Sequence, residues 1–478
     1  MAKHFFASLT RNGISLTGTA LAAASLTLFI ALIIIQWLGF EGGPYLGILT
    51  FLIIPALFAL GLILIPIGIY FERRRLKKDP AYADKPHFPV IDLNEERTRK
   101  SVVIFLVITL INIVVLAGAP YKGVHVMETV EFCGQACHTV MEPEFTAYQR
   151  SAHAKVTCAE CHIGAGADWF VKSKISGAWQ LVAVAFDLYP TPIPTPLHNL
   201  RPSRETCEEC HWPTKFVGDK LAVKTSYDDD EQNTEQTTAL LLHIGGVESQ
   251  GAYSGPDGAH GIHWHVDPSH EVRYLSSEDR ETIYDIEFVD SDGSVKVFKN
   301  TEAEAPAEAL ERGWRTMECI DCHNRPTHRY RMPDEEINHA ITDGRISRDL
   351  PYIKREGMRV LQADYPSHEA AREGIAAEIV AFYSENYPEI AVQMSDEVAG
   401  AGEALGQIWA WNVFPKMKVT WGTYPDHSGH QDNPGCFRCH NREHVSESGD
   451  KISRSCKLCH TVLANKKKDF DLNAALKD

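Results

Sequence analysis

Twelve cysteines in this 478-residue chain fall into six pairs, and a histidine directly follows the second cysteine of every pair. Two residues separate the cysteines in every pair but the first, which has three. The cysteines are Cys133, Cys137, Cys158, Cys161, Cys207, Cys210, Cys319, Cys322, Cys436, Cys439, Cys456 and Cys459, and the histidines are His138, His162, His211, His323, His440 and His460. No cysteine is left over for a disulfide, so this arrangement constrains the chain more than any other feature.

The spacing Cys-x-x-Cys-His is the attachment signature of c-type haem. The two thiols bond to the haem vinyl groups, and the adjacent histidine ligates the iron. Zinc sites built from such pairs take four ligands from two of them and need no histidine after each one. Redox dithiols would not occur six times. The sequence therefore predicts six covalently bound c-type haems, including one at the longer motif that starts at Cys133.

The charge balance excludes one class of partner. The chain carries 47 basic and 63 acidic residues, a net charge of −16. Nucleic-acid-binding chains show a basic footprint, so no nucleic-acid partner is predicted. With 44% hydrophobic residues, the chain is also not of the disordered class.

Three apolar segments lie near the N-terminus, at about 16–38, 44–70 and 102–119. Each approaches or exceeds the ~20 residues that a membrane-spanning helix needs. The alternative is a signal peptide cleaved near Ala22–Ala24, followed by buried core helices. The basic loop 71–101 is predicted to be cytoplasmic by the positive-inside rule. The N-terminus is then cytoplasmic, residues after 119 are periplasmic, and the protein lies in a bacterial inner membrane.

None of the three apolar segments contains a histidine, so they offer no ligands for a membrane-embedded b-type haem and are interpreted as an anchor. Low-spin electron-transfer haems take histidine or methionine as their second ligand. Candidates, chosen mainly for their position near the motifs, are Met141, His153, His243, His263, His265, His328, His427, His430 and His444. The alternation in His263-Trp264-His265 predicts a strand with both histidines on one face.

The remaining sequence predicts a mainly α membrane protein with three transmembrane helices. Its periplasmic multihaem part has little regular structure and a small β-rich insertion. The insertion covers about 214–315, with Asp292-Gly293 as a hairpin turn. Residues 334–412 are helical, including 367–383 with Ser367 as a cap. The predicted domains are a membrane anchor at 1–119, a haem domain at 120–333, and a helical extension with two further haems at 334–478.

From about residue 121 to 333 the chain resembles the NapC/NirT family of membrane-anchored tetrahaem quinol dehydrogenases. The matching stretches are Cys137-His138-Thr-Val-Met141, Tyr148–His153, Asn199–Pro202, Thr206–Pro213 and Cys319–His328 followed by Pro333. The resemblance implies that a quinol is oxidised at the outer membrane face and that four close-packed haems pass the electrons to a periplasmic partner. His153 and His328 match positions that supply distal ligands in that family.

The departures from that family concern the anchor and the length. Family members usually have one anchoring helix, and this chain has about 100 additional residues between its third and fourth motifs. It also has two further motifs after the fourth. This layout is similar to the longer multihaem inner-membrane cytochromes of metal-respiring bacteria.

A quinol site needs an apolar slot at the membrane surface and groups that hydrogen-bond and accept protons. The resemblance favours the helix from Lys172 to Gln180. The candidates are His125, Glu128, Glu131, Asp168, Lys172, Lys174 and Gln180. The alternative for the lysines is that they extend their ammonium groups to the membrane interface without any role in the reaction.

Two functions fit these observations. The first is oxidation of a (mena)quinol from the quinone pool, with electrons delivered to a periplasmic cytochrome or reductase. The second is a non-catalytic conduit, docked to membrane partner subunits that oxidise the quinol themselves. The Cys-x-x-Cys-Lys motif of haem nitrite reductases is absent, which counts against a terminal reductase. The haems are expected to form a relay from the Cys133 end to the Cys456 end.

Overall fold

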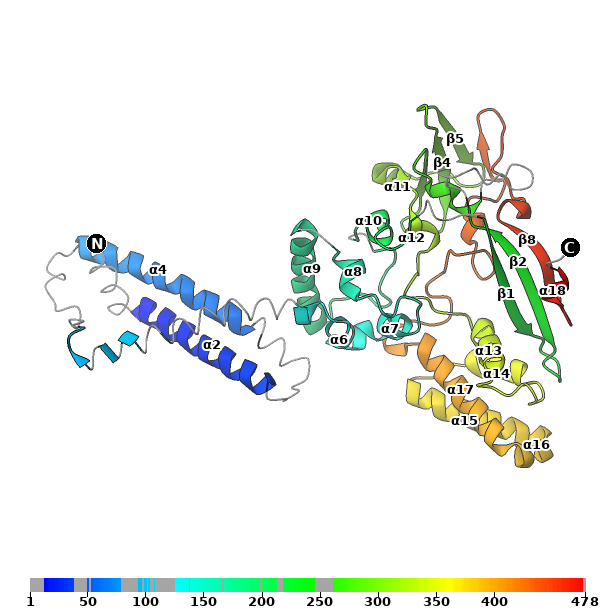
Figure 1. The fold of residues 1–478 in the computed structure, drawn as a ribbon, viewed down its shortest axis with the longest axis horizontal. Coiled ribbons are helices and arrows are strands. Elements are labelled where there is room, and N and C mark those ends of the chain that lie inside the picture. Colours follow the sequence, from blue (N-terminus) through cyan, green and yellow to red (C-terminus); the bar gives the residue numbers. More distant parts are fainter. Residues whose placement is uncertain are drawn as a thin grey trace. The chain divides into compact units, whose positions relative to one another are not determined.

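The computed structural model describes residues 13–37, 50, 53–78, 93–96, 99–100, 102–103, 107, 125–136, 138–164, 167–197, 200–212, 218–245 and 261–475. The chain divides into two compact units, Met1–Ala136 and Cys137–Asp478. Figure 1 shows the elements of both.

Two long apolar helices form an antiparallel pair in the first unit, α2 (Gly13–Trp37) and α4 (Ile54–Lys78). A Cβ atom added to Gly61 would lie 2.8 Å from the backbone nitrogen of Ala22, so the two backbones touch there. Small residues that permit such contact are typical of paired membrane helices. Both helices are long and apolar enough to cross a membrane.

The third predicted span, residues 102–119, lies outside the described residues apart from Val102, Val103 and Val107. The structure thus shows two candidate spans, and the third stays a prediction. The short helix α6 (Val130–Gln135) follows in the same unit, and the side chain of Thr129 caps its first turn.

Two small antiparallel sheets stand in the second unit, with strand orders β1-β2-β8 and β6-β3-β4-β5-β7. The predicted turn at Asp292-Gly293 is present between β4 and β5, where Gly293 has a φ of 81°. The strands are β1 (Asp219–Tyr227), β2 (Glu235–His243), β3 (Glu271–Ser276), β4 (Ile283–Val289), β5 (Val295–Asn300), β6 (Arg315–Thr316), β7 (His444–Ser446) and β8 (His460–Lys467).

Two of these strands come from the C-terminal extension, where the sequence predicted no strand. Strand β7 pairs with β5, and β8 pairs with β2. Each adds an outer strand to a sheet whose other members lie far away in sequence, and local residue patterns cannot reveal such pairing. The extension and the β-rich insertion are therefore built into the same two sheets.

A helical lobe between the fourth and fifth motifs contains the largest apolar core. Ser367 caps its longest helix as predicted, accepting a hydrogen bond from the backbone N–H of Ala370 at 3.1 Å. Ile375, Tyr383 and Leu405 are fully buried in this core. The helices are α13 (Pro333–Thr342), α14 (Ile353–Leu361), α15 (His368–Asn386), α16 (Pro388–Gln393) and α17 (Ser395–Asn412).

The replacement Trp409→Ala should destabilise this lobe more than any surface change. The Trp409 ring is only 2% exposed and lies edge-on to the ring of Tyr365. Truncation of a buried tryptophan costs about 3–5 kcal/mol, so the thermal midpoint should fall by several degrees. Val392→Ala, at a side chain that is 79% exposed, is the control. Equal midpoints for the two variants would contradict the assignment of this core.

Apart from α9, the remaining helices are short, and most of them carry or flank the cysteine motifs. They are α7 (His138–Gln149), α8 (Cys158–His162), α9 (Ala167–Ala185), α10 (Ser203–Cys207), α11 (Ala307–Arg312), α12 (Cys319–Cys322), α18 (Leu472–Ala475) and the 3₁₀ turns η6 (Ile262–Val266), η7 (Pro415–Met417), η8 (Gly435–Arg438) and η9 (Cys456–Leu458). The fold is mixed and mostly helical. It has more regular structure than predicted, because long-range pairing and helix packing order the extension.

Candidate haem sites

Single helical turns present the cysteine pairs. Helix α8 begins after Thr157, whose side chain accepts from the backbone N–H of Glu160, while the Glu160 carboxylate accepts from the N–H of Thr157. Residues three apart on such a turn lie on the same side. Cys158 and Cys161 are therefore placed to bond one porphyrin, with His162 directly behind them.

Hydrogen bonds to Asp321 connect the fourth motif to the β-rich insertion. Its buried carboxylate accepts hydrogen bonds from the Tyr274 hydroxyl at 2.7 Å, from Arg315 at 3.0 Å and from Arg280 at 3.1 Å. Burial, and then the charge of Asp321, raise the pKa of Tyr274, so the phenol stays protonated as the donor. The insertion thereby orients helix α12 and its two thiols.

Five motif histidines each face one other histidine across a gap. Two imidazoles that bind one iron from opposite sides have ring centres about 6 Å apart, since a metal–imidazole bond is about 2 Å long. The ring centres are 6.2 Å apart for His162 and His328, 6.0 Å for His211 and His153, 6.5 Å for His323 and His263, 5.8 Å for His440 and His265, and 6.2 Å for His460 and His430. Every pair is spaced to hold one haem iron.

The hydrogen bonds of the facing histidines support this arrangement. A backbone carbonyl only accepts, so a ring nitrogen beside it must carry the proton. The Nδ1 atoms of four facing histidines donate in this way: His153 to Pro326 at 3.3 Å, His263 to Ile244 at 2.5 Å, His265 to Ile262 at 2.8 Å and His328 to Glu144 at 3.0 Å. This contact fixes the tautomer and leaves Nε2 as the metal ligand.

Burial lowers the pKa of several of the paired histidines, which favours the neutral form that binds a metal. It lowers the pKa of His265 and of His328 to about 4. It also lowers the pKa of His162, His263 and His323. No proton therefore competes with the iron near neutral pH.

The structure corrects the prediction for His263-Trp264-His265. These residues form the 3₁₀ turn η6 rather than a strand. The two rings accordingly point to different partners, His323 and His440, instead of sharing one face. Alternation in the sequence does not distinguish a strand from a short turn when the tertiary partners are unknown.

Three other candidate ligands lie in hydrogen-bond networks instead. His243 meets Asp219 at 2.7 Å through Nδ1, and its Nε2 lies 3.3 Å from the Thr461 hydroxyl. The Nε2 of His427 lies 2.8 Å from a Glu281 carboxylate oxygen. His444 is fully buried between Asn441 and the carbonyl of Ile283. These contacts engage both ring nitrogens of His243 and His444 and the Nε2 atom of His427, and iron ligation by these three histidines stays a prediction.

The first motif is divided between the two units. Cys133 lies at the end of the first unit on α6, while Cys137 and the ring of His138 are outside the described residues. Met141 is half-buried on α7, and His125 is exposed in the first unit. Ligation by Met141 and a role for His125 therefore stay predictions.

Helix α9 carries most of the predicted quinol-site residues. Asp168 and Lys172 are four residues apart and thus lie on one face, although the side chain of Asp168 is outside the described residues, and Gln180 follows about two turns further along the helix. The Lys172 ammonium lies 4.3 Å from the centre of the Trp169 ring, and Gln180 donates to Ser176 at 3.3 Å. Lys174, two residues from Lys172, lies on a different face.

An exposed apolar stripe runs beside that polar face. It consists of Ile175, Trp179, Val182 and Phe186, which recur every three or four residues. Trp179 is 62% exposed and Phe186 is 72% exposed. Soluble proteins rarely expose a contiguous apolar patch of this kind to water. This face of α9 is therefore suited to contact lipid or an apolar ligand.

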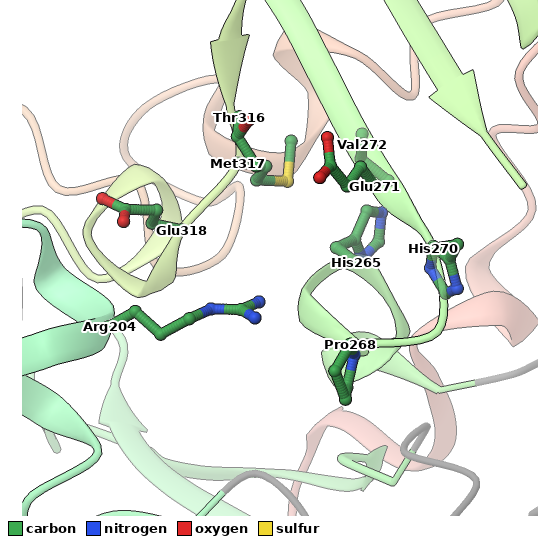
Figure 2. A pocket seen from close by; sticks show the side chains of 9 residues that line it. All are labelled: Arg204, His265, Pro268, His270, Glu271, Val272, Thr316, Met317 and Glu318. Atoms are coloured by element: carbon green, nitrogen blue, oxygen red, sulfur yellow. The ribbon is translucent and has the colours of Figure 1, made fainter. Parts of the chain in front are cut away.

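A cavity of about 210 Å³ lies beside His265 and is lined by Arg204, His270, Glu271, Met317 and Glu318 among others. Figure 2 shows the Arg204 guanidinium and the Met317 thioether bordering this space. Arginine forms strong charge-assisted hydrogen bonds with carboxylates. The cavity is thus bordered by one guanidinium and by the carboxylates of Glu271 and Glu318.

The residues present fit haem better than a bare metal ion. Within the described ranges, no group of three or more His, Cys, Asp or Glu side chains is arranged to hold an ion. Cys161, Cys210, Cys322, Cys439 and Cys459 are thiols that form no disulfide. A haem iron takes four ligands from the porphyrin nitrogens, so it requires only two from the protein, and a pair of histidines can supply them.

Comparison with known proteins also points to c-type haem. Residues 95–193 match the N-terminal region of the NapC/NirT cytochrome c family. Over 473 residues the chain is 39% identical to the cytochrome c-type protein ImcH of Geobacter sulfurreducens, a match that covers 98% of this chain and 91% of that protein. The chain belongs to the NapC/NirT cytochrome c family. No solved structure matches it.

Membership of the NapC/NirT family makes this chain a c-type cytochrome and an electron-transport protein. The sequence identified the motif histidines, but it gave no signal for their pairing. Each facing histidine other than His430 comes from a distant segment or from the turn η6. Asp321, Arg204 and the carbonyls that fix the ligand tautomers were also missed, because their role depends on tertiary contacts alone.

Proposed function

We propose that this NapC/NirT-family cytochrome is a hexahaem protein of a bacterial inner membrane that oxidises a (mena)quinol at the periplasmic face. Its haems pass the electrons to a periplasmic cytochrome or reductase. The observation that carries this proposal is the set of five facing histidine pairs, each spaced for one iron. Helices α2 and α4 supply a membrane anchor.

Contacts between successive motifs support a continuous relay. The backbone N–H of Ile320, inside the fourth motif, donates to the Ser203 hydroxyl at 3.4 Å, and Ser203 lies on helix α10, which carries Cys207 of the third motif. The ring of Phe437, inside the fifth motif, stacks on the ring of His430 with 4.3 Å between their centres, and His430 faces His460 of the sixth motif. The fifth and sixth motifs are therefore also adjacent.

The surface of α9 suits the quinol step. A quinol has an apolar tail and two hydroxyl groups, and its oxidation releases two protons and two electrons. The apolar stripe can contact the tail, while Lys172 and Gln180 can hydrogen-bond the hydroxyl groups and hold them near a proton acceptor. Haem supplies one-electron acceptance when it is bound.

Reduction by quinol without any partner tests this proposal. The purified, haem-loaded protein in lipid would receive a menaquinol analogue, and the haem α-band would be followed. Fast reduction that a quinol-site inhibitor slows would support the dehydrogenase. No reduction by quinol, with dithionite still reducing the haems, would overturn it in favour of a conduit that depends on another subunit.

The replacement Lys172→Met should slow quinol-driven haem reduction by about 10²-fold, the order of loss expected when a substrate is held out of its reactive position. Reduction by dithionite should not change, because it needs no quinol contact. Lys174→Met is the matched control, since it removes the same charge from another face of α9. A similar loss in both variants would point to surface charge rather than to a quinol contact.

A further inference from the structure

Two haem sites draw a ligand from one short turn of the insertion, η6. The ring of His263 lies nearly parallel to that of His323, with 16° between their planes. The ring of His265 stands nearly perpendicular to that of His440, at 83°. Only Trp264 separates the two ligands in the sequence, so both iron sites are tied to the same helical turn.

We propose that His263-Trp264-His265 is a ligand bridge between the fourth and fifth haem sites, and that Trp264 is the residue that positions both ligands. The inference rests on the haem relay proposed above. Neither ligand can shift without moving the other, so the bridge fixes the separation of the two irons. Electrons would cross here from the haems of the family-like region to the two haems of the C-terminal extension.

Trp264 packs against the five-stranded sheet and so anchors the bridge to it. Its ring centre lies 5.3 Å from that of Phe288 on β4 and 4.4 Å from that of His270. The Nε2 atom of His270 donates a hydrogen bond to the Trp264 carbonyl at 2.8 Å. Trp264 also packs against the buried side chains of this sheet. Contacts with residues that are not proposed haem ligands thus determine the position of η6.

The two sites are joined on their proximal side as well. Arg438 lies inside the fifth motif, and its Nη2 donates to the carbonyl of Asp321, inside the fourth motif, at 2.8 Å. Its Nη1 donates to the carbonyl of Arg280 at 2.6 Å, next to the group that anchors Asp321. One contact therefore joins the proximal motifs, while the bridge joins the distal ligands.

The ring angles make the two sites distinguishable by electron paramagnetic resonance. The angle between the two imidazole planes sets the splitting of the iron d orbitals. Nearly parallel planes give a rhombic low-spin ferric signal, and nearly perpendicular planes give a signal with a large maximum g value. The His430–His460 pair, at 27°, and the His153–His211 pair, at 76°, contribute one further signal of each kind.

The ligand test uses His263→Met and His265→Met in the full-length, haem-loaded, oxidised protein. His263→Met should halve the rhombic signal, and His265→Met should halve the large-g signal. Each should also raise the reduction potential of one haem, because methionine ligation raises it. A variant that alters both signals, or two variants that alter the same one, would overturn the assignment.

The positioning test uses Trp264→Ala, which should shift both signals and both potentials while the haem content stays unchanged. Trp314→Ala, at a half-exposed tryptophan, should shift neither. Trp264→Phe keeps a ring against Phe288 and should give smaller shifts in both, which provides a measurement should the alanine variant fail to fold. Unchanged signals in Trp264→Ala, or in Trp264→Phe where only that variant folds, would refute the positioning role. None of these measurements uses quinol, so a chain that quinol cannot reduce would overturn the proposed function alone.

Discussion

A chain in which Cys456 and Cys459 are both replaced by alanine should still be reduced by quinol but should no longer deliver electrons to its acceptor. The sixth motif lies at the end of the proposed relay and adjoins the fifth, because His430 stacks on Phe437 of the fifth motif and faces His460 of the sixth. Without the two thiols the haem cannot be attached covalently, so the haem content should fall by one. Quinol-driven reduction of a periplasmic cytochrome would be measured together with the α-band of the remaining haems.

The controls for this experiment distinguish a loss of electron transfer along the relay from a loss of folded structure. His460 begins strand β8, which pairs with β2, so circular dichroism must first show that the sheets persist. The corresponding double replacement of Cys158 and Cys161 should interrupt the relay near its start and leave most haems oxidised. If quinol fails to reduce any haem in the Cys456/Cys459 variant, the direction of the relay is wrong.

The second large effect is expected from His328→Ala. His328 faces His162 across 6.2 Å, and its Nδ1 is held by the Glu144 carbonyl. Without that ring, the iron behind His162 loses one axial ligand and becomes high-spin. The reduced variant should therefore bind one more carbon monoxide per chain than the unmodified protein, and added imidazole should restore the low-spin spectrum.

His368→Ala is the matched control for His328→Ala. The ring of His368 lies near Trp409 and Phe414, its Nε2 is 2.7 Å from the Val413 carbonyl, and it belongs to none of the five facing histidine pairs. This variant should bind no additional carbon monoxide. Additional binding in both variants, or in neither, would refute the assignment of His328 as an iron ligand.

The elements that the sequence predicted well are those with local signals. The apolar runs of α2 and α4, the cap at Ser367 and the turn at Asp292-Gly293 each depend on residues close to one another. The membrane run at 102–119 stays a prediction. The strand expected at His263-Trp264-His265 was wrong, because packing of Trp264 on the sheet overrides a three-residue alternation.

The sequence by itself determined the chemistry, because haem attachment requires two thiols and a histidine at a fixed local spacing. Only the tertiary structure decided which histidine faces each of five motif histidines. A distal ligand needs only to reach the opposite side of the porphyrin, so no spacing rule links His328 to His162 or His153 to His211. The order of the haems is likewise a property of side-chain contacts such as Arg438 to Asp321, which distant segments of the chain make only after folding.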